Sequence, residues 1–275
     1  MIGAAFGLLT ALLIGLGDLF GRRVSIRSSP ITSATAMQGF GAVTVALSLL
    51  IWRGKPEYRD LALGAASGLG FATGLCCYYF GLKNTTSAVV APVTAVIATC
   101  VPFIWVLAIG QGVSQLASIG VVVALAGLVM VTTDGEVAGK IKSGVLWGLI
   151  SGLGYGFGVT VLLNVTANGG TWVLTSQRLL AFAVMVPVAM TARASITPPS
   201  GTRLAALVAG VFAGSASITC FLGLQFDPLA TVIAMSLFPV FSVLVGVFAY
   251  NDHASARQAW GIAMAVVGTA AVVGG

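Results

Sequence analysis

The stretch from residue 87 to residue 109 reads SAVVAPVTAVIATCVPFIWVLAI and contains no charged side chain. An α-helix rises about 1.5 Å per residue, so a stretch of this length crosses the roughly 30 Å hydrocarbon core of a membrane. A transmembrane β-strand would instead alternate apolar and polar side chains. The stretch therefore predicts a membrane-spanning α-helix.

The rest of the chain has the same character. Hydrophobic residues make up 58% of the 275 residues and charged residues only 7%, against about 25% charged residues in a soluble domain. So few charges cannot cover a soluble particle of this size, which excludes a water-soluble enzyme. The apolar runs predict an all-α integral membrane protein with ten transmembrane helices, near residues 3–20, 32–52, 61–82, 87–109, 115–133, 144–166, 171–191, 204–224, 229–250 and 258–274.

The two halves of the sequence repeat at a shift of about 141 residues. The matching residues preserve their order and most of their spacing. They are Phe6-Gly7 with Trp147-Gly148, Gly15 with Gly156, Gln38 with Gln177, Gly68 with Gly210, Gly81-Leu82 with Gly223-Leu224, Gln111 with Asp252, Gly120 with Gly261 and Gly127 with Gly268. We expect two five-helix units, residues 1–137 and 138–275.

Because five is an odd number, the second unit must enter the membrane from the opposite side, which gives an inverted-topology repeat. Such repeats commonly build secondary transporters, in which the two halves exchange conformations and expose a central site to each side in turn. A duplicated bundle without moving parts is the alternative. The repeat favours alternating access.

The residues also match a known family. The segment SLFPVFSVLVGVFAYNDHASARQAWGIAMAVVGTAAVV, residues 236–273, resembles the closing helices of the EamA family in the drug/metabolite transporter superfamily. Pro239, Asp252, Gly261 and Gly268 occupy its proline, acidic turn and Gly-x6-Gly places, and Arg178 is similar to its arginine early in the second helix of each unit. The first half departs from this pattern with Gly39 and Gln111. The sequence is most similar to the YddG-type exporters of aromatic amino acids.

The basic residues indicate an orientation. Nine lie in the odd-numbered predicted loops and three in the second loop, so the positive-inside rule puts the odd loops in the cytoplasm and both termini outside. We expect a multi-pass protein of a bacterial inner (plasma) membrane, in contact with lipid and sufficient as a monomer. The net charge of +6 is spread over short loops and predicts no nucleic-acid partner.

Small and helix-breaking residues indicate how the bundle packs and moves. Gly-x-x-x-Gly pairs recur in the helices predicted near residues 3–20, 61–82, 144–166 and 204–224, where they allow close backbone approach. Prolines inside spanning helices free a carbonyl group and kink the helix. Pro92, Pro102 and Pro239 are therefore predicted hinges of moving gates, with a static kink as the alternative.

Polar and aromatic side chains in mid-membrane are the candidate substrate ligands. Tyr155 lies between four glycines, and Tyr78 and Tyr79 point about 100° apart, so only one of these two is expected to face the cavity. The candidates are Gln38, Tyr78, Tyr79, Thr94, Tyr155, Ser215, Ser217 and Thr219. Asp18 and Arg178 fall near predicted helix ends, and we expect both to reach toward the lipid headgroups.

An intramembrane enzyme and a channel are the competing classes. Gly15-x-Gly-Asp18 matches the motif of intramembrane aspartyl proteases, but that chemistry needs a second embedded aspartate. The one histidine, His253, is in a predicted loop, and the four cysteines show no metal-ligand spacing, so we expect no metal and no cofactor. A channel would be expected to show a symmetric or charged pore lining.

A transporter remains the best-supported class. An apolar cavity with tyrosines and hydroxyl groups suits a zwitterion with an apolar body, and the family resemblance implies export of amino acids. We therefore predict a secondary transporter that exports aromatic and other neutral amino acids or related small metabolites. The alternative cargo is a drug or an organic cation. No deeply embedded carboxylate is expected, so we predict uniport without obligatory proton coupling.

Overall fold

The computed structural model describes residues 2–110, 114–132, 138–227, 231, 234, 235 and 237–274, and all regular structure in them is helical. The longer helices of the first half are α1 (Ile2–Arg27), α2 (Pro30–Ser48), α3 (Tyr58–Asn84), α4 (Ser87–Ala108) and α5 (Gln115–Thr132). Those of the second half are α6 (Ala138–Leu162), α7 (Gly170–Thr191), α8 (Arg203–Phe226), α10 (Phe238–Tyr250) and α11 (Ala256–Gly274). Two 3-10 turns, η2 (Ala167–Gly169) and η3 (Ser200–Thr202), precede α7 and α8.

The all-α membrane fold agrees with the prediction. Among the described residues, six helices (α1, α3, α4, α6, α7 and α8) contain segments long and apolar enough to cross a membrane, and α5 and α10 contain shorter apolar segments. The prediction that all ten helices span the membrane goes further than this. Most of the first part of the predicted 229–250 span lies outside the described residues.

The first helix is longer than predicted. It runs to Arg27 instead of ending near residue 20, so Arg22 and Arg23 are helical residues and not loop residues. Charged side chains do not end a helix, whereas the following Ser28-Ser29-Pro30 does. Ser29 caps the next helix, because its Oγ accepts a hydrogen bond from the backbone N–H of Thr32 at 3.0 Å, and Pro30 occupies the first turn of α2.

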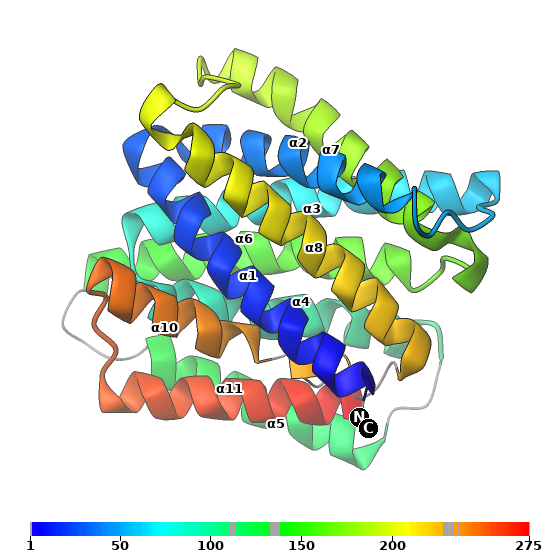
Figure 1. Cartoon of the computed structure of the whole chain (residues 1–275). Coiled ribbons are helices and arrows are strands. Elements are labelled where there is room, and N and C mark those ends of the chain that lie inside the picture. Colours follow the sequence, from blue (N-terminus) through cyan, green and yellow to red (C-terminus); the bar gives the residue numbers. More distant parts are fainter. Residues whose placement is uncertain are drawn as a thin grey trace.

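The helices pack in a pattern that repeats between the halves. Helix α1 packs on α8 and α10, and its counterpart α6 packs on α3 and α4; likewise α2 packs on α8, and α7 on α3. Figure 1 shows α1 and α8 running side by side, α5 and α11 together at the lower edge, and the two termini close to each other. The main contacts therefore join one half to the other.

Glycines make the close contacts between the halves. A Cβ placed on Gly70 of α3 would lie 2.4 Å from the carbonyl oxygen of Gly154 in α6. A Cβ placed on Gly127 of α5 would lie 2.5 Å from the carbonyl oxygen of Gly261 in α11. Side chains at these positions would force the helices apart, so the glycines act mainly in packing, as the sequence predicts.

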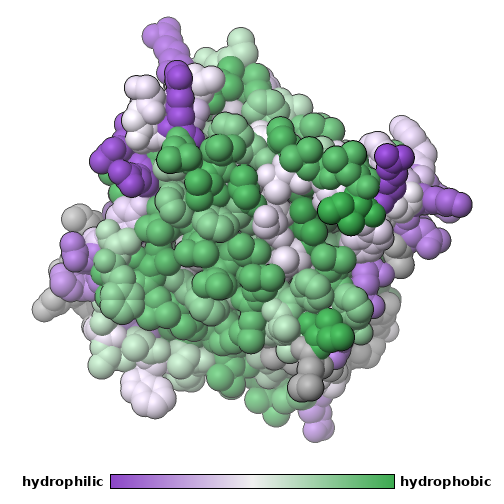
Figure 2. All heavy atoms as spheres, viewed as in Figure 1, coloured by the Kyte–Doolittle hydropathy of each residue, from purple (hydrophilic) through white to green (hydrophobic). Residues whose placement is uncertain are grey.

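The outer surface is apolar between the helix ends. Figure 2 shows hydrophobic residues over most of the visible face and hydrophilic residues gathered toward its left and right edges. Large apolar side chains such as Phe248, Trp260 and Leu153 are exposed there. Water would not favour such a surface, but lipid does. The chain is a multi-pass integral membrane protein.

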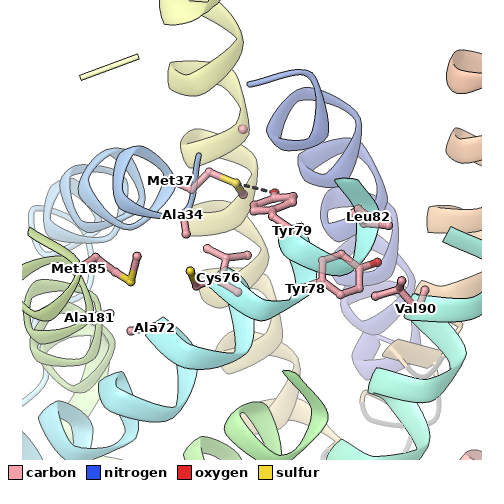
Figure 3. Packing of buried hydrophobic residues seen from close by; sticks show 13 residues of the cluster. Ala34, Met37, Ala72, Cys76, Tyr78, Tyr79, Leu82, Val90, Ala181 and Met185 are labelled. Atoms are coloured by element: carbon pink, nitrogen blue, oxygen red, sulfur yellow. Dashed lines mark hydrogen bonds between the residues drawn. The ribbon is translucent and has the colours of Figure 1, made fainter. Parts of the chain in front are cut away.

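The largest buried cluster lies between α2, α3, α4, α7 and α8. Figure 3 shows Met37 of α2, Tyr78 and Tyr79 of α3, and Met185 of α7 in this cluster. Tyr155 of α6 packs against it. The predicted tyrosine candidates therefore meet at the centre of the bundle.

Candidate substrate site

Tyr78 and Tyr79 lie side by side in the centre but direct their hydroxyl groups to different partners. Their ring centroids are 6.1 Å apart. The Tyr78 hydroxyl donates to Asp18 Oδ2 at 2.9 Å, and the Tyr79 hydroxyl donates to Met37 Sδ at 2.6 Å. Figure 3 shows the Tyr79 ring directed toward Met37 and the Tyr78 ring directed toward Val90. Both rings are buried, in different surroundings.

Tyr155 lies over α3. Its ring covers Gly74, where an added Cβ would lie 2.8 Å from the ring carbon Cγ, and it meets the Phe71 ring edge-to-face at 5.4 Å. The neighbouring glycines make room for helices and not for an open cavity. Gly154 and Gly158 approach α3, whereas Gly152 and Gly156 approach α4.

Arg178 is buried in the bundle, and the prediction that it reaches the headgroups is wrong. Its side chain lies in the third turn of α7 and is only 6% exposed. Nη1 donates to Gln38 Oε1 at 2.8 Å, and Nη2 donates to Ser217 Oγ at 2.7 Å and to the Ala213 carbonyl at 3.1 Å. The predicted candidates Gln38 and Ser217 are thus brought together by a residue that the prediction had placed elsewhere.

Asp18 is also buried, contrary to the prediction. Because α1 continues for nine residues beyond it, Asp18 is far from the helix end and 7% exposed. Its Oδ2 accepts hydrogen bonds from Tyr78 and from the hydroxyl of Ser242 in α10. It lines a cavity of about 10 Å³, room for about one water molecule, together with Arg22, Leu82, Ser87, Ser242, Val245, Gly246 and Tyr250.

The sequence did not reveal an ion pair beside this cavity. Arg22 Nη1 and Nη2 donate to the two carboxylate oxygens of Asp252 at 2.6 and 3.0 Å. Ser87 donates to Asp252 Oδ2 through its backbone N–H and its hydroxyl, and Arg22 lies over the Tyr250 ring at 4.5 Å. The pair joins the ends of α1, α4 and α10. The repeat contained one sign of it: in the register of the two halves, the counterparts of Arg22 and Asp252 are the uncharged residues Leu163 and Gln111.

Two of the three other polar candidates make hydrogen bonds between helices. Thr94 of α4 donates to the Gly148 carbonyl of α6 at 3.4 Å, so it faces a packed interface. Thr219 of α8 shares a hydrogen bond of 2.8 Å with Thr10 of α1. Ser215 is half-buried on α8. These three are not among the partners of Arg178.

The predicted hinges differ from one another. Pro92 and Pro102 lie inside α4, as predicted, and the helix continues through both. Pro239 is different: it occupies the first turn of α10, where its missing N–H has no helical partner to lose. Residues 231, 234 and 235 before it are also helical and Leu237 forms a turn, so a hinge at Pro239 stays a prediction. Pro187 inside α7 was not among the predicted hinges.

The described residues contain no group of three His, Cys, Asp or Glu side chains that could hold a metal ion. The buried side chains at the junction of the two halves offer aromatic rings, hydroxyl groups, an amide, a guanidinium and a carboxylate. These groups can bind a small polar or aromatic solute.

Comparison with known protein families gives a match. The model of the EamA-like transporter family matches residues 1–133 and 142–274, nearly the whole chain. The chain belongs to the EamA-like transporter family. It is a membrane transporter of the drug/metabolite transporter type.

A solved crystal structure, described only as that of a protein, shares the fold of this EamA transporter. The match has a TM-score of 0.68 and 19% sequence identity, and it covers 98% of this chain and 95% of the other. At this identity the likeness shows the fold alone. No curated protein matches the sequence.

Proposed function

We propose that this EamA transporter exports aromatic and other neutral amino acids, or related small metabolites, by alternating access without obligatory ion coupling. The similarity to YddG-type exporters supports the cargo. One structural observation carries the proposal: Tyr78 contacts the Asp18 carboxylate directly, and Tyr155 is connected to the Arg178 guanidinium through Phe71 and Gln38.

The contacts form two branches around the central rings. Tyr78 donates to the Asp18 carboxylate. Tyr155 contacts the Phe71 ring, the Phe71 carbonyl accepts from Gln38 Nε2 at 3.1 Å, and Gln38 accepts from Arg178. A zwitterion presents opposite charges that such groups can take up, and an aromatic ring stacks on tyrosine with about 0.5–1.5 kcal/mol beyond its burial. The arrangement suits an amino acid with an apolar side chain.

The second candidate is efflux of drugs or organic cations. The observation in its favour is Asp18, a buried carboxylate that lines the small cavity. Arg178 disfavours a cationic cargo, because a buried guanidinium repels a cationic solute. We therefore rank amino acids first.

Alternating access follows from the inverted repeat. Each half makes its main contacts with the other, so a rocking movement would exchange equivalent contacts. We propose that α3, α4, α8 and α10 form the moving walls and that a single chain is sufficient. By the positive-inside rule we expect the ends of α1, α3 and α10 on the cytoplasmic side of a bacterial inner membrane.

The cargo test is exchange of radiolabelled phenylalanine in proteoliposomes. Tyr78→Ala, Tyr79→Ala and Tyr155→Ala should lower aromatic exchange, and the matching Phe variants separate the ring from the hydroxyl group. Tyr58→Ala is the control, because Tyr58 is 87% exposed. Saturable exchange stimulated by solute on the opposite side indicates a carrier, and single-channel conductance indicates a channel. Unchanged exchange in all three alanine variants, or stronger competition by sugar phosphates than by phenylalanine, contradicts the assignment.

A further inference from the structure

Arg178 differs from an ordinary buried arginine in having only neutral partners. Every hydrogen bond that the described residues accept from it ends on an amide oxygen, a hydroxyl or a backbone carbonyl. Its Nε is buried without a hydrogen-bond partner, as is that of Arg22, so the neutral partners are what distinguish Arg178. Arginine has five N–H donors and keeps its charge in proteins. One donor of Arg178 therefore has no acceptor, and its positive charge has no counter-ion among the described residues.

A cation without a counter-ion is strongly unfavourable inside a membrane protein, and such residues are rare except where they serve a function. A purely structural role would be met more cheaply by an apolar side chain of similar size. The repeat agrees, because the corresponding place in the first half is Gly39, which packs against the Phe182 ring. The first five-helix unit of this chain therefore folds without an arginine at this place.

The surroundings indicate what the missing counter-ion is. Gln38 connects Arg178 to the Phe71 carbonyl, and the Phe71 ring contacts Tyr155. An anionic group on Arg178 would therefore have aromatic rings within reach of its attached side chain. The planar guanidinium fork matches the geometry of a carboxylate.

We propose that Arg178 binds the carboxylate of the transported solute, so that a free carboxylate is a requirement for recognition. Gln38 and Ser217 hold the guanidinium when the solute is absent and yield part of it when the solute binds. This inference rests on the proposed function and narrows it: aromatic amino acids and aromatic monocarboxylates are ligands, and their decarboxylated amines are not.

A competitor series tests the inference on the unaltered protein. Exchange of labelled phenylalanine is measured with phenylalanine, 3-phenylpropionate, phenylalaninamide and phenylethylamine as competitors. The two carboxylates should compete, whereas the amide and the amine should be at least about tenfold weaker, a difference of 1.4 kcal/mol in binding. Equal competition by phenylethylamine overturns the proposal.

A variant series makes the same test at the residue. Arg178→Gln should raise the half-saturating phenylalanine concentration at least about tenfold, and Arg178→Lys should give a smaller loss. Arg203→Gln is the control, because it removes an exposed arginine at the start of α8. Unchanged half-saturation in Arg178→Gln contradicts the proposal.

Thermal stability with each ligand separates this inference from the proposed cargo. If the wild type does not carry phenylalanine but carboxylates stabilise it and not Arg178→Gln, the cargo is wrong and the role of Arg178 stands. If the wild type carries phenylalanine and Arg178→Gln binds it equally well, the role of Arg178 is wrong and the cargo stands. Without transport or any carboxylate-dependent stabilisation, both are wrong.

Discussion

Two buried arginines in this transporter have opposite surroundings. Arg22 makes a bidentate ion pair with Asp252, which also accepts two hydrogen bonds from Ser87. Arg178 is equally buried but contacts the neutral groups of Gln38, Ser217 and Ala213. The first charge is compensated by the protein and the second is not.

Under the role proposed for Arg178, the difference separates a structural contact from a binding contact. A compensated pair at the ends of α1, α4 and α10 holds one mouth of the bundle together. In the repeat register the sequence has Leu163 and Gln111 at the positions equivalent to Arg22 and Asp252. An uncompensated charge at the centre instead leaves binding energy for a ligand.

The largest effect is expected from locking the paired mouth. A Cβ placed on Gly246 of α10 lies 3.1 Å from the Cβ of Ser87 in α4, close to the separation in disulfides of about 3.5–4.5 Å. In the Ser87→Cys/Gly246→Cys variant, oxidation should abolish phenylalanine exchange and a reductant should restore it, because alternating access requires this mouth to open.

The control for the lock is Ser87→Cys/Gly246→Ala. It introduces the same crowding near Asp252 and keeps the four native cysteines, but it cannot form the new disulfide. Its exchange should not respond to oxidant. If the oxidised double-cysteine protein exchanges phenylalanine as fast as the reduced protein does, α4 and α10 do not separate at this mouth.

The next effect concerns stability at the same pair. Arg22→Leu leaves the Asp252 carboxylate buried without its counter-ion, which should cost about 3–5 kcal/mol of unfolding free energy. Arg22→Leu/Asp252→Gln, which copies the residues of the other repeat, should recover most of that loss, because no buried charge remains unpaired. Unfolding in detergent measures both. A double variant as unstable as the single one would mean that pairing is not the reason for the stability.

Replacing Arg178 should cost less stability than replacing Arg22. Arg178→Met removes an uncompensated cation, so its stability loss should be limited to the cost of the unpaired Gln38 oxygen, about 1–3 kcal/mol. Adding Gln38→Met should bring stability back toward that of the wild type, while phenylalanine exchange stays low in both variants. If Arg178→Met destabilises the protein more than Arg22→Leu does, the division between the two arginines fails.

The sequence predicted the architecture better than the polar interior. Apolar runs and glycine spacing are local signals, and they gave the helical membrane fold and the close packing of residues such as Gly70. The charges of Arg22 and Arg23 suggest a loop after residue 20, but charged side chains do not end a helix, and α1 continues to Arg27. A helix end near residue 20 would lie close to Asp18, which hid the burial of this residue.

Partners distant in sequence explain the remaining errors. Arg22 and Asp252 are 230 residues apart, and Arg178 and Gln38 are 140 residues apart. Which charge meets which partner depends on the packing of helices from both halves, and no local pattern records it. The rule that embedded charges are functional would have been a better guide to Arg178 than its distance from a helix end.

The smallest effect is expected at Asp18. Asn at this position keeps an oxygen that can accept from both Tyr78 and Ser242, so Asp18→Asn should change stability by less than about 1 kcal/mol. If transport is uniport, exchange of phenylalanine should persist in Asp18→Asn, and a pH step alone should drive no accumulation in wild-type proteoliposomes.

Uphill uptake driven by the pH step and lost in Asp18→Asn would instead make Asp18 a proton-binding site. A loss of affinity for phenylalanine but not for 3-phenylpropionate would assign Asp18 to the ammonium group, which would place the two charges of the solute on Asp18 and Arg178.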